Sequence, residues 1–146
     1  MIETKIADKN DIEKLIPSFI KAFNDGEWKQ KWTDATTKIS LENIFSFPNF
    51  YGLVAKKEGE TVGAILGHIQ TFNDVKTYYI DELFIDPSYQ KQGIAKKLYQ
   101  KTIKDLRREG VTGSFFTTLR NSAAYDFYVS QGAIDLKDSA VFYHPF

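Results

Sequence analysis

The sequence predicts a single α/β domain over residues 1–146, in which a mixed, mostly antiparallel sheet carries helices on both faces. Three consecutive strand-like runs joined by short turns are typical of an antiparallel meander. A later strand–helix–strand succession requires a crossover between parallel strands. The length suits one hydrophobic core, and the chain contains no repeat, linker or low-complexity tract.

The N-terminal part predicts one strand and two helices. Ile2 to Ile6 alternates apolar and polar residues like a short strand, and Asp8 can cap the helix that follows. Pro17 lies inside that helix, where we expect a kink or a weak turn. A second helix is expected over Asp34–Phe45.

The middle of the chain predicts the meander. Phe50–Lys57 and Thr61–Thr71 flank a hairpin turn at residues 58–60, and Lys76–Ile85 forms the third strand. Asp86 and Pro87 end it, since proline cannot donate a ladder hydrogen bond.

The last part predicts the crossover and the end of the sheet. A long amphipathic helix is expected from Gly93 to Glu109, followed by a strand over Gly113–Leu119 and a helix over Ser122–Gln131. Residues 133–143 are expected to hold two short closing strands.

Composition excludes several classes of function. Nineteen basic and nineteen acidic side chains cancel, so we expect neither nucleic acid nor a membrane as partner. The chain has no cysteine and two isolated histidines, so we expect no catalytic metal. The charged N-terminus does not resemble a signal peptide, and no apolar run approaches the length of a membrane span. We therefore expect a cytoplasmic protein.

The most informative segment lies between a strand end and a helix start, at Tyr89–Leu98. The first turn of a helix leaves about four backbone N–H groups unpaired and carries roughly half a positive charge. Gly93 and Ala95 would let an anion approach these groups, and Lys91 and Lys96 add positive charge. The segment therefore predicts a phosphate-binding turn, although an ordinary strand-to-helix turn remains the alternative.

The spacing Gln-x-x-Gly-x-Ala matches neither common nucleotide loop. It resembles the acyl-coenzyme A pyrophosphate loop of the GNAT superfamily of N-acetyltransferases. The segment Asn121–Ala133 is similar to a second motif of this superfamily, Asn-x-x-Ala-x-x-Phe-Tyr-x-x-x-Gly-Phe, with Ala133 in place of the commoner phenylalanine. A weaker likeness around Phe23, Trp28 and Trp32 points to the aminoglycoside or polyamine branch.

This resemblance implies a fold and a cofactor. The sheet would splay at its centre, and acetyl-coenzyme A (acetyl-CoA) would be the co-substrate, wedged between the strand ending at Ile85 and the next one. It implies contacts with the cofactor from a set of largely main-chain groups: Leu83, Phe84, Ile85, Gln90, Lys91, Gln92, Gly93, Ile94, Ala95, Lys96, Asn121, Ala124 and Tyr128.

The reaction implied is direct attack of a primary amine on the thioester in a ternary complex. A lysine-like amine is free base in only about one molecule in a thousand at neutral pH, so a carboxylate base helps. Asp81 is slightly favoured over Glu82, with a solvated pair of carboxylates as the alternative. Both can face the acetyl group only if a β-bulge interrupts the strand. Tyr128 matches the family's acid, the alternative being a half-buried helix aromatic.

The acceptor pocket is expected to draw on Asp25, Glu27, Trp28 and Trp32, because acidic and aromatic groups attract a cationic amine. The alternative is that the tryptophans anchor a loop on the core. His68 is expected to be structural.

Several alternatives stay open. The acceptor can be a small-molecule amine, which we favour, or a protein lysine or N-terminus. A non-catalytic module that binds acyl-CoA, or a nucleotide-binding protein of another fold, would also use a phosphate turn. The protein is expected to be a monomer or a homodimer.

Overall fold

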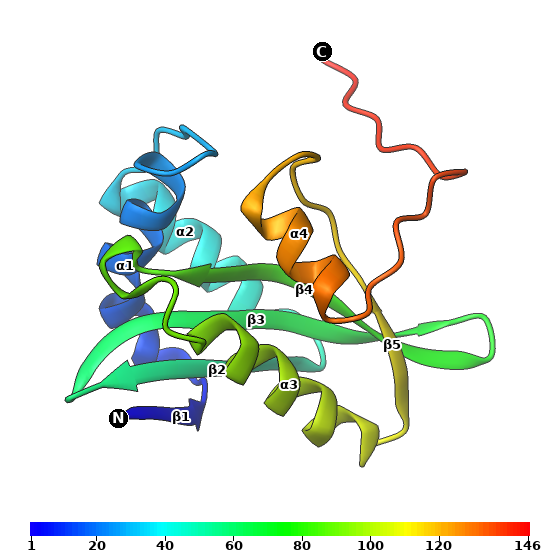
Figure 1. Cartoon of the computed structure of the whole chain (residues 1–146), viewed down its shortest axis with the longest axis horizontal. Coiled ribbons are helices and arrows are strands. Elements are labelled where there is room, and N and C mark those ends of the chain that lie inside the picture. Colours follow the sequence, from blue (N-terminus) through cyan, green and yellow to red (C-terminus); the bar gives the residue numbers. More distant parts are fainter.

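The computed structural model describes residues 1–146 (Figure 1). Its elements are β1 (Ile2–Ile6), α1 (Ile12–Asn24), α2 (Asp34–Phe45), β2 (Phe50–Lys57), β3 (Glu60–Phe72), β4 (Val75–Ile85), α3 (Ile94–Arg107), β5 (Val111–Phe115) and α4 (Ala123–Ser130), with short 3-10 turns η1 (Lys9–Asp11) and η2 (Pro87–Tyr89). The order of these elements agrees with the sequence up to α4.

The strands form one five-stranded sheet in the order β1-β2-β3-β4-β5. Neighbouring strands from β1 to β4 are antiparallel, and β5 runs parallel to β4 after the α3 crossover. This is the mixed, mostly antiparallel α/β sheet that the sequence predicts.

Two hydrophobic cores cover the two faces of the sheet. Along β3, Leu66 packs with α1 and α2, whereas its neighbour Ile65 packs with α3. Adjacent strand residues point to opposite faces, so one strand supplies both cores. The nearly continuous apolar run in β3 follows from this double burial.

The sheet splays at its centre. β5 pairs only with Lys76–Tyr79, the first part of β4. The rest of β4, to Ile85, pairs with β3 alone. The splay expected from the resemblance is therefore confirmed, and it leaves one edge of β4 open beside α3 and α4 (Figure 1).

Three local expectations need correction. The strand expected over Gly113–Leu119 begins two residues earlier, at Val111, and ends four residues earlier, at Phe115. α1 continues through Pro17 as one helix, so the weak turn does not form, and apolar side chains buried on one face hold the helix. The closing strands expected over residues 133–143 are absent. Those residues have the apolar side chains of a strand, but no neighbouring strand pairs with them.

No helix has the length and apolar character required to cross a membrane.

Candidate active site

The turn after β4 is built from short-range hydrogen bonds. The Asp86 carboxylate accepts the backbone N–H of Ser88 at 2.9 Å, which starts η2. The side-chain amide of Gln90 donates to the carbonyl of Ile85 at 3.3 Å. The glutamine of the motif therefore shapes the turn that leads into α3.

The N-terminus of α3 has no cap of its own. Gly93 occupies the N-cap position with φ +77°, and it has no side chain to accept an amide hydrogen. Lys91 also has a positive φ, +62°. Within the protein, none of the backbone N–H groups of residues 91–96 has a hydrogen-bond acceptor. A helix start with successive unpaired amides binds anions.

The side chains around this turn are basic and have few partners. Lys91 and Lys96 are exposed and form no ion pair. Lys57 donates to the side chain of Gln92 at 2.9 Å, and Lys97 donates to the carbonyl of Ile2. Ile94 is buried beneath the turn and Ala95 is partly buried, so these two residues anchor the helix and expose its amides.

The end of β4 presents main-chain groups at the open edge. Leu83, Phe84 and Ile85 pair with Ile65, Ala64 and Gly63 of β3 on one side only. Phe84 packs among the aromatic rings of α1, and Leu83 and Ile85 pack on the opposite face. Because these side chains pack in the two cores, the main-chain groups are the ones available to bind a ligand at this edge.

A β-bulge lies where the two candidate bases stand. Leu66 pairs with Glu82 and Gly67 pairs with Ile80, so Asp81 is the extra residue on β4. The bulge required for both carboxylates to serve one site is therefore present. Asp81 lies 2.8 Å from Nδ1 of His68 on β3, and both side chains are mostly buried.

Glu82 differs from Asp81 in having no hydrogen-bond partner in the protein. Burial, and then the charge of Asp81, raises the pKa of Glu82 to about 8. Burial also raises the pKa of Asp81, but the contact with His68 acts in the opposite direction. A carboxyl group that titrates near neutral pH is suited to general acid–base chemistry.

Tyr128 of α4 is buried against other aromatic rings. Its ring lies 4.2 Å from that of Phe116 and 5.8 Å from that of Tyr99. Burial, followed by the charges of Tyr99 and Glu82, raises the pKa of Tyr128 well above its usual value. The hydroxyl is therefore protonated across the physiological range, and no protein group accepts its hydrogen.

The start of α4 is capped by the protein itself. Ser122 accepts the backbone N–H of Tyr125 at 3.1 Å, and the Glu27 carboxylate accepts that of Ala123 at 3.3 Å. Asn121 is exposed just before this cap with φ +62°, and Ala124 is partly buried on the helix.

The expected acceptor residues lie in the loop between α1 and α2. Trp32 meets Phe19 edge to face at 4.9 Å, and Trp28 packs on Phe23 at 5.9 Å. Both tryptophans therefore anchor the loop on the first core. Asp25 and Glu27 are exposed, and the contact of Glu27 with the start of α4 brings this loop across to the second motif.

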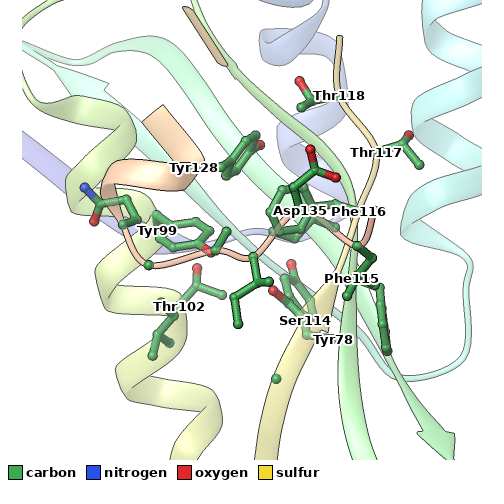
Figure 2. A pocket seen from close by; sticks show the side chains of 18 of the residues that line it. Tyr78, Tyr99, Thr102, Ser114, Phe115, Phe116, Thr117, Thr118, Tyr128 and Asp135 are labelled. Atoms are coloured by element: carbon green, nitrogen blue, oxygen red, sulfur yellow. The ribbon is translucent and has the colours of Figure 1, made fainter. Parts of the chain in front are cut away.

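A cavity of about 1240 Å³ lies between α3, β5 and α4 (Figure 2). Tyr128, Tyr99 and Tyr78 line it together with Phe116. Residues between Ala133 and Val141 also line the cavity, whereas no residue of the turn at residues 91–96 does.

The sequence did not indicate the role of His68 beyond a structural one. Its partner, Asp81, is on the neighbouring strand, and only the register of β3 against β4 brings the two together. The aromatic surroundings of Tyr128 were likewise missed, because Phe116 follows β5 in a segment that was expected to continue the strand. No three His, Asp or Glu side chains gather as a metal site would require.

Comparison with known proteins agrees with this geometry. A family model described as the acetyltransferase (GNAT) family matches residues 13–133. An uncharacterized N-acetyltransferase of Archaeoglobus fulgidus is 25% identical over 134 residues, which cover 89% of this chain and 91% of the relative.

Solved structures share the fold. An aminoglycoside acetyltransferase from an uncultured soil metagenomic sample, in complex with sisomicin, is 24% identical with a TM-score of 0.77, over 99% of this chain and 96% of that one. The aminoglycoside N-acetyltransferase AAC(6')-Iy in complex with CoA is 15% identical with a TM-score of 0.77, over 99% and 95%.

The family match spans both motifs, the open edge of β4 and the uncapped start of α3. The chain belongs to the acetyltransferase (GNAT) family and is an acyltransferase.

Proposed function

We propose that this protein transfers the acetyl group of acetyl-CoA to a primary amine of a small molecule, by direct attack in a ternary complex. One observation carries the proposal: the backbone N–H groups of residues 91–96, in the turn and helix start that follow the open edge of β4, have no acceptor in the protein. A diphosphate can accept several of these hydrogen bonds at once, aided by the helix dipole.

The residues present fit acetyl-CoA. Gly93 has no atom within 4 Å of the position that a Cβ would take, so the backbone is accessible there. Lys91 and Lys96 add charge. Main-chain groups of Leu83, Phe84 and Ile85, with Gln92 and Asn121, would bind the remaining length of the cofactor, which supplies an acetyl group activated as a thioester.

Glu82 is proposed as the base. Its carboxylate has no competing partner, whereas that of Asp81 is held by His68. In its charged form Glu82 accepts the proton of the amine as the new C–N bond forms. Asp81 then acts by orienting the bulge and by raising the pKa of its neighbour.

Tyr128 is proposed as the acid. It donates its hydroxyl proton to the sulfur as the C–S bond breaks, and its high pKa keeps that proton available at neutral pH. Its interaction with Glu82 supports a common site for the two groups.

The acceptor is proposed to bind beside the loop of residues 25–32. Asp25 and Glu27 would attract a cationic amine, and Trp28 and Trp32 would form an apolar wall. The aminoglycoside acetyltransferases among the structural neighbours support a small-molecule acceptor.

A thiol-release assay tests the proposal. Acetyl-CoA is incubated with the protein and with aminoglycosides, polyamines, amino acids or peptides, and free thiol is measured. We expect amine-dependent thiol release that is largest with a small-molecule amine. Tight binding of acetyl-CoA without release for any amine would make the protein a non-catalytic module, and preferential binding of ATP in a parallel titration would make the turn a nucleotide site.

A further inference from the structure

The cavity between α3, β5 and α4 is much larger than an acetyl group requires (Figure 2). Its volume is about 1240 Å³, and 17 of its 30 lining residues are hydrophobic. Pockets of roughly 300–1,000 Å³ already hold drug-sized ligands, which are far larger than acetyl. The size and the apolar lining therefore suit a longer, apolar occupant.

The cavity lies beyond the proposed reaction centre along β4. Residues 83–85 present the main-chain groups of the open edge, Glu82 comes next, and Ile80 and Tyr78 line the cavity. Neither residues 83–85 nor the turn at residues 91–96 line it. A cofactor whose diphosphate is bound at that turn brings its thioester to Glu82. The part of the acyl group beyond the thioester then continues toward Ile80 and Tyr78.

Tyr128 joins the cavity to the reaction centre. We have placed its hydroxyl beside the thioester sulfur, and the same residue lines the cavity. Its ring lies 4.2 Å from that of Phe116 and 5.8 Å from that of Tyr99, and both of these residues line the cavity as well (Figure 2). The cavity therefore begins at the group that we assign to the leaving sulfur.

The cavity also lies on the face of the sheet that we assign to the acyl donor. Tyr78, Tyr99 and Tyr128 belong to the core that includes α3. Trp28 and Trp32 of the proposed acceptor loop pack on the other core, which includes α1 and α2. An occupant of the cavity therefore belongs to the donor and not to the amine.

The register of β4 and β5 sets the length of the cavity. Its lining extends along the sheet from Ile80 to Val111, which pairs with Lys76. The four strand residues from Lys76 to Ile80 span about 13 Å at about 3.3 Å each. Consecutive Cα atoms, which are three bonds apart, are separated by about 3.8 Å, so about 13 Å corresponds to an extended chain of about ten bonds.

We propose that the protein also transfers linear acyl groups of about six to ten carbon atoms, whose apolar tail lies in this cavity. The inference rests on the proposed function, since the chemistry is the same. The amine nitrogen forms a bond to the thioester carbon as the C–S bond breaks, Glu82 accepts the amine proton and Tyr128 donates a proton to the sulfur. The products are a medium-chain amide and free CoA.

A series of donors tests the length of the acyl group. Thiol release is measured with acetyl-, hexanoyl- and octanoyl-CoA and one small-molecule amine, and calorimetry gives the affinity of each donor. Each buried methylene group can tighten binding by up to about fourfold, so we expect octanoyl-CoA to bind at least about tenfold more tightly than acetyl-CoA and to be transferred. Transfer of acetyl alone would overturn this inference and leave the proposed function intact. Release from no donor would overturn the proposed function, and this inference with it.

Substitutions in two walls test whether the chain lies in this cavity. Ser114 on β5 is exposed and Thr102 on α3 is buried, and both line the cavity (Figure 2). Ser114→Leu and Thr102→Leu each add bulk there. The ratio of kcat/KM for octanoyl-CoA to that for acetyl-CoA should fall by about tenfold or more in each variant.

Thr71→Leu is the matched control, because Thr71 is an exposed residue of β3 that does not line the cavity. It should keep the native ratio of the two kcat/KM values. Ser114 is exposed, so the fold should tolerate Ser114→Leu even if Thr102→Leu disturbs the packing of α3. If Ser114→Leu keeps the native ratio with an unchanged circular dichroism spectrum, the acyl chain lies elsewhere and the inference is overturned.

Discussion

The helices α3 and α4 begin in opposite ways. At α4, Glu27 and Ser122 accept the backbone N–H groups of Ala123 and Tyr125, so the protein itself caps two of the first three amides of this helix. At α3, Gly93 offers no side chain, and the N–H groups of residues 91–96 have no acceptor. α3 follows β4 and α4 follows β5, and these are the two strands between which the sheet splays. We propose from this difference that the start of α3, and not that of α4, binds the diphosphate.

The same contrast recurs between the neighbouring carboxylates of the β4 bulge. Asp81 is held by His68, whereas Glu82 has no partner and titrates near pH 8. An unpartnered carboxyl group with a raised pKa is a candidate for a functional role. The unpartnered member of each pair is the one to which we assign a function.

The largest effect is expected at the bulge. Glu82→Gln keeps the shape of the side chain but removes the base, so the turnover number should fall by roughly 10²–10⁴-fold while the affinity for acetyl-CoA is unchanged. Asp81→Asn breaks the contact with His68 and should cost less than about tenfold. Steady-state kinetics and calorimetry measure the two quantities. A larger loss for Asp81→Asn would reverse the assignment of the base.

The next largest effect is expected at the start of α3. Gly93→Asp introduces a negative charge beside the diphosphate, which should weaken acetyl-CoA binding by about 2–4 kcal/mol, or about 30- to 1,000-fold. Gly110→Asp is the matched control at the other end of the same helix, because Gly110 also has a positive φ, +83°, and free space around it. Gly110→Asp should lose about as much stability as Gly93→Asp, but calorimetry should show the same affinity for acetyl-CoA as the native chain. Equal affinities for the two variants would remove the phosphate site from this turn.

The pH dependence of activity should follow Glu82. Its pKa is raised to about 8, so the carboxyl group is protonated and inactive as a base at lower pH. kcat/KM should therefore rise with pH up to about 8, by about tenfold per pH unit on the acid side. In the Glu82→Gln variant the limb should lose its bend near pH 8 and instead follow the free-base fraction of the amine up to the amine's own pKa.

The stability of the fold should also depend on the ionisation of Glu82, but it should fall as pH rises, whereas activity should increase. A pKa raised on folding means that the folded state favours the neutral acid. The native chain therefore loses stability as pH rises from about 4.5, the ordinary value, to about 8. Glu82→Gln should be more stable than the native chain at pH 8 and comparable to it at pH 4, measured by thermal melting. If the melting temperatures of the two proteins changed with pH in the same way, Glu82 would not be buried as described.

The smallest effect is expected at the start of α4. Ser122→Ala removes the N-cap bond to Tyr125 and should cost about 1 kcal/mol of unfolding free energy. The melting temperature should fall by about 2–5 °C with no change in acetyl-CoA affinity. A loss of affinity larger than the loss of stability would mean that α4, like α3, contacts the diphosphate.

Much of the fold, and the glycine turn that precedes α3, could be predicted because their signals are local. The helix expected at about Asp34–Phe45 is confirmed, because its apolar residues and the proline that follows at position 48 lie close together in the sequence. The turn before α3 was recognisable because glycine spacing, lysines and a strand end lie within ten residues of sequence.

What could not be predicted depends on pairing across the sheet. The contact of His68 with Asp81 and the choice between the two carboxylates follow from a single extra residue in the β3–β4 register, which leaves no mark on composition. The closing strands expected over residues 133–143 are the opposite kind of error, because the sequence predicted them and the structure lacks them. Residues 141–143 have strand propensity, but a strand forms only beside an edge that it can reach.

The most direct test follows the backbone amides themselves. The central claim is that the backbone N–H groups of residues 91–96 donate hydrogen bonds to a diphosphate, whereas those of Ala123 and Tyr125 already have acceptors within the protein. Amide NMR of the chain during titration with acetyl-CoA should shift the first set strongly and the second set little, and acetyl-pantetheine, which lacks the diphosphate, should leave both sets nearly unchanged. Saturable binding of acetyl-CoA with no shift at residues 91–96 would contradict the account.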